Sequence, residues 1–202
     1  TKIVFQNDIE GSFIVPEVAG RALTIDGNHK KLTGAFQING KSTYAGATTV
    51  YKNINFEIND ASKATYAFSG ANYKYPAIAT IYAAAATFED CDFDVDIATG
   101  VCGINYGSHV AGKPLTVNKC TFEGDFYAIR SRTLFSITNC DFNIYTDQGK
   151  LAAVFTWGNG TSGTNNDAGA NSVVFTGNTN SNANEVYGVQ LTSTTFNYAH
   201  IN

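Results

Sequence analysis

Carboxylates alternate with apolar residues in the stretch EDCDFDVD at 89–96. Successive side chains of a β-strand lie on opposite faces, so Asp92 and Asp94 are expected on the face opposite Cys91 and Phe93. Acids on one strand face suit two kinds of chemistry. Hydrolysis of a glycosidic bond needs two carboxylates about 5 to 10 Å apart, and Ca²⁺ takes several carboxylate oxygens.

The pattern of this stretch recurs along the chain as an apolar residue, two polar residues, Cys or Ile, a polar residue and Phe. It is found at 51–58, 88–95, 117–124 and 137–144, with a weaker copy at 175–182. A second apolar element follows most copies, at 101–107, 126–132, 152–158 and 186–192. Units of unequal length that cannot bury their apolar faces alone are typical of a β-solenoid, in which each unit is a rung.

Composition agrees with an all-β domain that has its own core. Of the 202 residues, 44% are hydrophobic and 15% charged, and no stretch has a long helical period. We expect a single β-helix domain over 1–202, or a segment of a longer solenoid. Both ends of the chain have the sequence pattern of rung strands. If the chain is not a segment of a longer solenoid, we expect copies of it to associate through these ends.

Charge and hydropathy exclude two classes of partner. The net charge is −4 and the sequence contains no Lys/Arg cluster, which argues against nucleic acid. No apolar run approaches the roughly 18 to 20 residues of a spanning helix, so no membrane insertion is expected.

The stretch LTIDGNHKKLTG at 23–34 resembles the opening rung of the right-handed parallel β-helix, or pectin-lyase-like, superfamily. The recurring pattern is similar to its later rungs, so the resemblance covers nearly the whole chain. It implies an all-β fold, a right-handed parallel β-helix (solenoid) of about six to seven irregular rungs. The superfamily includes polysaccharide lyases and hydrolases, phage tail spikes, surface adhesins and proteins without known activity, so the fold does not choose a function.

Aligning the rungs predicts two outward rows on the first face. They are Asn55, Asp92, Thr121 and Asp141, and Glu57, Asp94, Glu123 and Asn143. Like charges opposite one another destabilise strand pairing, and Glu57, Asp94 and Glu123 are three in succession. A Ca²⁺ ion bound by these three would offset the repulsion, although no EF-hand loop is present; screening by solvent and salt is the alternative. No other cofactor is expected.

The same alignment puts Cys91, Cys120 and Cys140 at one inward register, which predicts a buried row of small apolar side chains. Disulfides, including one with Cys102, are the alternative for an exported protein. Metal binding by the cysteines is not expected, because the sequence has no CxxC or Cys/His spacing and its three histidines are scattered.

The second element of each rung carries a more varied outward strip. Asn105, Arg130 and Gln190 share a register, with Tyr106, Arg132 and Trp157 close by. Amides, guanidinium groups and aromatic rings suit a carbohydrate ligand. The alternative is that these six are ordinary surface residues that bind no ligand.

Catalysis would depend on Asp92 with Asp141, or on Asp94 with Glu123, with Arg130 as a further contributor. The sequence lacks the Asn-Thr-Asp, Asp-Asp, Gly-His-Gly and Arg-Ile-Lys elements of polygalacturonase-like enzymes and the lyase element Arg-x-Pro-x-x-Arg. We therefore favour a nonenzyme.

The function expected is that of a noncatalytic extracellular or surface β-helix, an adhesin-like or structural module that binds glycans through a lateral face. The alternatives are a polysaccharide lyase or glycoside hydrolase on the acidic strand face, and a phage or virus fibre or tail-spike component. The expected location is accordingly secreted, on the cell surface or in the virion.

Overall fold

The structure is a computed structural model of the 202-residue chain. It describes residues 1–11, 13–16, 18–34, 36–39, 47–58, 77–81, 85–95, 102–106, 115–124, 127–131, 135–144, 152–156, 173–179 and 187–191. These residues form strands and turns and contain no helix. The expected all-β class is therefore confirmed for this part of the chain.

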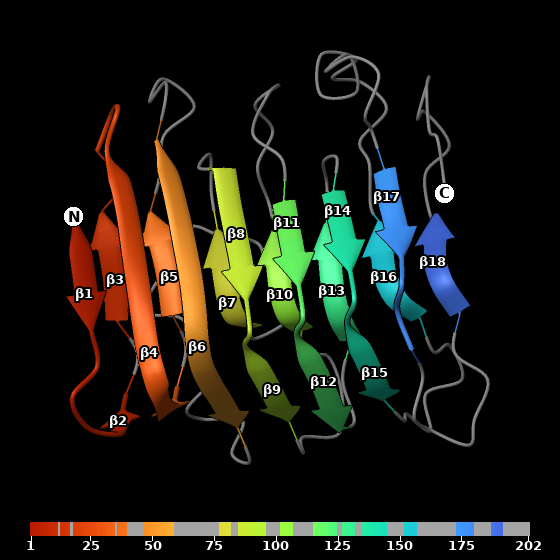
Figure 1. The fold of residues 1–202 in the computed structure, drawn as a ribbon, viewed down its shortest axis with the longest axis horizontal. Helices are drawn as coiled ribbons and strands as arrows, with labels where there is room; N and C mark the ends of the chain where they lie inside the picture. Colours follow the sequence, from red (N-terminus) through yellow and green to blue (C-terminus); the bar gives the residue numbers. More distant parts are fainter. Residues whose placement is uncertain are drawn as a thin grey trace.

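The strands form two parallel sheets, and Figure 1 shows the seven-stranded sheet behind the eleven-stranded one. In chain order the eleven-stranded sheet holds β1 (Lys2–Val4), β2 (Ile9–Glu10), β4 (Ala22–Thr33), β6 (Thr48–Ile58), β8 (Ala85–Glu89), β9 (Asp92–Val95), β11 (Leu115–Asn118), β12 (Thr121–Gly124), β14 (Phe135–Thr138), β15 (Asp141–Ile144) and β17 (Val173–Thr176). The seven-stranded sheet holds β3 (Phe13–Pro16), β5 (Phe36–Asn39), β7 (Ala77–Ile81), β10 (Cys102–Tyr106), β13 (Tyr127–Ser131), β16 (Ala152–Thr156) and β18 (Tyr187–Leu191).

The chain runs through the eleven-stranded sheet, then through the seven-stranded sheet, and then repeats; we call each such stretch a rung. Every strand pair between successive rungs is parallel. The first half of the long strand β6 pairs with β8 and its second half with β9. The eleven-stranded sheet is therefore strongly curled, with one row of strands on each side of a corner (Figure 1).

A left-handed backbone residue makes this corner in successive rungs. The corner residues and their φ values are Asn53 (53°), Asp90 (50°), Lys119 (54°), Asn139 (56°) and Gly177 (68°). Gly, Asn and Asp adopt this conformation at little cost, whereas other residues are strained by the contact of Cβ with the backbone. The second of the two polar residues in the repeated sequence pattern is thus the turn residue between the strand rows.

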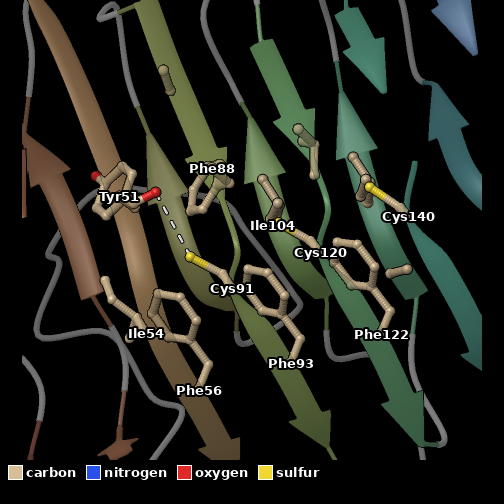
Figure 2. Packing of buried hydrophobic residues seen from close by; sticks show 14 of the residues in the cluster. Tyr51, Ile54, Phe56, Phe88, Cys91, Phe93, Ile104, Cys120, Phe122 and Cys140 are labelled. Carbon is tan, nitrogen blue, oxygen red and sulfur yellow. Dashed lines mark hydrogen bonds between the residues drawn. The ribbon is translucent and has the colours of Figure 1, made fainter. Parts of the chain in front are cut away.

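Stacked aromatic side chains fill the core behind this corner. The rings of Phe56, Phe93, Phe122 and Phe142 lie nearly parallel, with centroid separations of 4.7, 4.7 and 5.0 Å along the row. Tyr51 stacks on Phe88 at 4.5 Å in the same way. Such pairs contribute about 0.5 to 1.5 kcal/mol each beyond their buried area. The predicted inward register of the Phe position is confirmed (Figure 2).

Lys119 is the corner residue least suited to its backbone conformation. We expect Lys119→Asn to raise the free energy of unfolding by roughly 0.5 to 1 kcal/mol, because Asn tolerates a left-handed φ better than Lys. Chemical denaturation measures the change. Lys119→Ala removes the same charge but has no short polar side chain to hydrogen-bond locally in the left-handed conformation. Equal stabilisation by both substitutions would therefore contradict this explanation.

Candidate functional site

The two predicted acidic rows lie on the second strand row of the eleven-stranded sheet. Backbone pairing places Asn55 opposite Asp92, Asp92 opposite Thr121, and Thr121 opposite Asp141. In the other row Glu57, Asp94, Glu123 and Asn143 follow one another. Asp92, Asp94 and Glu123 are exposed, whereas Phe93 between the two aspartates is buried. The alternation predicted for EDCDFDVD is therefore confirmed over 91–95, and Asp96 lies outside the described residues. The two rows are here called the acidic face.

A lysine that the sequence reasoning missed offsets part of the repulsion on this face. Lys31 pairs with Asn55 in the first row, and its ammonium group forms an ion pair with Glu57 in the second. The hydrogen bond from Lys31 to the Glu57 carboxylate raises the pKa of the lysine. The backbone N–H of Lys31 also donates to Asp8 Oδ1 at 3.0 Å. Aligning 30–32 with 54–56, after allowing for the longer corner of this rung, would have found this lysine.

The acids lie in a row and do not converge on one point. In the described ranges, no group of three or more His, Cys, Asp or Glu side chains could hold a metal ion. Glu57, Asp94 and Glu123, the residues expected to bind Ca²⁺, are thus brought into register without forming such a group.

Of the two pairs expected to act in catalysis, the structure places Asp94 directly opposite Glu123 in the neighbouring strand and separates Asp92 from Asp141. Asp92 and Asp141 lie on the acidic face with Thr121 between them, so their strands are about 9.6 Å apart, two strand spacings. This separation is at the upper end of the range for glycoside hydrolysis. The Thr179 hydroxyl donates to Asp141 Oδ1 at 2.7 Å. Arg130 lies in β13 of the other sheet.

Backbone pairing confirms the shared register predicted for the second strip. Asn105 pairs with Arg130, Arg130 with Phe155, and Phe155 with Gln190. The row continues in the other direction through Thr80 and Gln37. Phe155 was missed, although it occupies this position in the repeated element at 152–158. Arg132 and Trp157 lie outside the described residues, as do the side chains of Asn105, Arg130 and Gln190.

Tyr106 was expected on this outward strip, and that expectation is wrong. Its exposed fraction is 0%, as is that of Ser131, its partner in the next strand. Tyr106 lies two residues after the buried Ile104, so strand alternation puts both on the core face. Tyr106 is adjacent to Asn105 in sequence but lies on the opposite face of the strand.

The cysteines form the buried row that the rung alignment predicts (Figure 2). Cys91, Cys120 and Cys140 are free thiols with exposed fractions of 0%, 1% and 1%. The N–H groups of Thr121 and Asp141 donate to the carbonyls of Cys91 and Cys120 at 3.0 Å, which fixes the three in register. The side chain of Cys102 lies outside the described part. We call Cys91, Cys120 and Cys140 the thiol row.

Asp26 is the most strongly held carboxylate among the described residues for which a pKa shift is resolved. Its Oδ1 accepts hydrogen bonds from Asn53 Nδ2 at 3.0 Å and from the Asn28 N–H at 3.1 Å. Lys2 and Lys52 place their ammonium groups 3.2 and 3.6 Å from its Oδ2. The Asn53 hydrogen bond is the largest cause that lowers the pKa of Asp26, to about 2. The sequence pattern does not single out Asp26, because its partners come from three rungs.

Comparison of the chain with protein-family models, with curated proteins and with solved structures gives no match. Among the residues that the structure describes, no helix is long and apolar enough to span a membrane.

The lowered pKa of Asp26 predicts a loss of stability in acid. The folded-state pKa of about 2 lies below the ordinary 3.8, so the stabilisation is fully present above about pH 4 and disappears as the pH falls toward 2. We expect Asp26→Asn to lower the free energy of unfolding at pH 7 by about 2 kcal/mol. The difference between variant and native chain should shrink between pH 4 and pH 2 in denaturant titrations. An unchanged difference at pH 2 would contradict the assigned role.

The Lys31 ion pair predicts a salt-dependent effect on the acidic face. Lys31→Gln should lower the melting temperature, because the repulsion among Glu57, Asp94 and Glu123 is then no longer offset by the Lys31 ammonium group. High salt should reduce the loss by screening the carboxylates, and adding Asp94→Asn should restore part of the stability. Lys30→Gln is the matched control on the same strand. A loss from Lys31→Gln that salt leaves unchanged would argue against repulsion as its cause.

Proposed function

We propose that the chain is a closed, right-handed parallel β-helix of about six to seven rungs in the pectin-lyase-like superfamily. Support comes from the parallel pairing of every strand with those of the neighbouring rungs and from the aromatic and thiol rows that continue from rung to rung. Crossovers between parallel strands are nearly always right-handed, because the strand twist favours that hand. The resemblance of 23–34 to the superfamily's opening rung agrees with this hand.

We infer that this β-helix is a noncatalytic module, adhesin-like or structural, which is secreted or displayed on a cell surface and binds glycans through the seven-stranded sheet. One observation carries the inference: six successive strands place Gln37, Thr80, Asn105, Arg130, Phe155 and Gln190 at one register. We call these six residues the polar row.

From strand alternation we expect the polar row on the sheet face opposite the core. It is flanked in β10 and β13 by positions whose side chains are buried, namely Ile104, Tyr106, Ile129 and Ser131. Strand alternation puts the row on the other face from these residues. Its positions recur about every 4.8 Å along the sheet, so an extended glycan can meet one position after another.

The chemistry of the polar row favours a glycan with acidic groups. Amides and hydroxyls exchange hydrogen bonds with sugar hydroxyls, an aromatic ring packs on the apolar side of a sugar, and a guanidinium group binds a carboxylate through two hydrogen bonds. The row contains one residue that is charged at neutral pH, Arg130. We therefore expect uronate-containing polysaccharides to bind better than neutral ones.

A glycan array followed by titration calorimetry tests this function. Arg130→Ala should weaken binding of an acidic polysaccharide about 10-fold or more, because a hydrogen-bonded ion pair is lost. Lys119→Ala is the matched control, since it removes one positive charge from a corner of the other sheet. Equal weakening by both variants would mean that Arg130 acts only through general charge attraction, which would contradict a specific site. Absence of any glycan ligand would refute the proposal.

The alternative of a polysaccharide lyase or glycoside hydrolase is favoured by one observation, the shared face of Asp92 and Asp141. Assays for reducing ends and for unsaturated products on acidic polysaccharides decide between the two functions. Product formation that disappears in Asp92→Asn and Asp141→Asn would establish the enzyme and overturn the noncatalytic proposal. A virion fibre or tail spike is a structural variant of the leading proposal, because continuous in-register strands also suit a stiff rod.

A further inference from the structure

The segment 1–10 contains β1 and β2, which both pair with β4. We call this segment the strap. Phe5 is its one buried side chain, and the structure describes all of its residues. Ile3 and Val4 keep exposed fractions of 40% and 38%, and Ile9 is only partly buried. Apolar packing therefore contributes little to holding the strap in place.

The strap covers one edge of β4. Ile3 lies at the register of Ile25, and Ile9 at the register of Leu32. Both of these β4 residues are fully buried, in contrast to their partners in the strap. Segments with few buried apolar contacts open locally at a lower free energy than the core. Opening of the strap frees N–H and C=O groups of β4, with which another strand can pair.

A carboxylate between two lysines joins the strap to the rungs behind it. Asp26 Oδ2 in β4 lies 3.2 Å from Nζ of Lys2, in the strap, and 3.6 Å from Nζ of Lys52, in β6. Glu89 of β8 follows Lys52 in the same row. Protonation of Asp26 removes the negative charge between the two ammonium groups, and like charges at such distances repel each other. The contact that holds β1 against β4 is thereby turned into a repulsion between the strap and β6.

A second carboxylate holds the strap beside β2. Asp8 Oδ1 accepts a hydrogen bond from the N–H of Lys31 in β4 at 3.0 Å. The Lys31 ammonium group, which is ion-paired with Glu57, also attracts the Asp8 carboxylate. Hydrogen bonds to a charged acceptor are about twice as strong as those to a neutral one, so protonation of Asp8 weakens this contact. Carboxylates thus hold the strap at both of its strands.

The direction of the pH effect follows from the partners of Asp26. The Asn53 hydrogen bond is the largest cause that lowers the pKa of Asp26 to about 2, and it joins β4 to β6, so it remains when the strap opens. Lys2 lowers the same pKa by a smaller share, and this share is lost on opening. The closed strap is therefore fully supported above about pH 4 and loses that support as the pH falls toward 2.

We propose that the strap is an acid-released device, which opens at low pH and uncovers the edge of β4 while the later rungs stay folded. The later rungs stay folded because stacked phenylalanine rings, which carry no ionisable group, hold their core. The device is independent of the glycan-binding function, because the polar row belongs to the seven-stranded sheet.

Amide hydrogen exchange, followed by NMR at about pH 7 and about pH 2, tests the strap. The N–H of Phe5 donates to the Asp26 carbonyl at 2.9 Å and reports on opening. The N–H of Thr121, which donates to the Cys91 carbonyl at 3.0 Å, is the matched probe between later rungs. After correction for the intrinsic effect of pH, protection of Phe5 in acid should fall about 10-fold or more, and that of Thr121 less than about 3-fold. An equal fall at both amides would overturn the proposal.

Lys2→Gln separates the assigned cause from a general weakening in acid. At neutral pH this variant should lower the protection of Phe5 about 2- to 5-fold, because an exposed ion pair is lost. Its further loss in acid should be smaller than that of the native chain, because Lys52 then has no lysine of the strap to repel. Lys119→Gln is the matched control and should leave Phe5 unchanged. A loss in acid as large in Lys2→Gln as in the native chain would refute the strap's assigned release.

Discussion

The structure depends on in-register stacking of like side chains in successive rungs. The backbone hydrogen bonds of parallel strands place equivalent residues about 4.8 Å apart. At that distance Phe56, Phe93, Phe122 and Phe142 stack face to face, and the thiols beside them form a second row. A shift by one residue would turn every one of these side chains to the other face. The buried rows therefore hold the strands in the only register that keeps the core apolar.

The same constraint produces the charge problem on the outer surface. The register that stacks Phe93 on Phe122 also places Asp94 beside Glu123, although these two carboxylates repel each other. In the first rungs, lysine side chains offset part of the negative charge. Lys31 forms an ion pair with Glu57. Asp26 is held by ion pairs with Lys2 and Lys52 and by a hydrogen bond from Asn53. Surface charges of this sort follow from the core and need not have been selected for a ligand.

Strand alternation explains both the correct site predictions and the wrong one. The acidic rows and the shared register of Asn105, Arg130 and Gln190 were predictable, because the repeated pattern marks which residues are equivalent. Tyr106 was misplaced because its neighbour in sequence lies on the opposite face. Lys31 was missed because the corner of its rung is longer: the pairing of β4 with β6 shifts register between Asp26 and Lys30.

The sequence by itself determined which residues face the core and which face outward, since a period of two and a recurring Cys-x-Phe pattern suffice for that. It also determined which residues recur at equivalent positions. Only the tertiary structure decided what each outward residue meets. Asp26 draws partners from β1 and β6, because rungs are joined by segments of unequal length. Contacts between rungs depend on hydrogen bonds between residues far apart in sequence, and no local pattern encodes them.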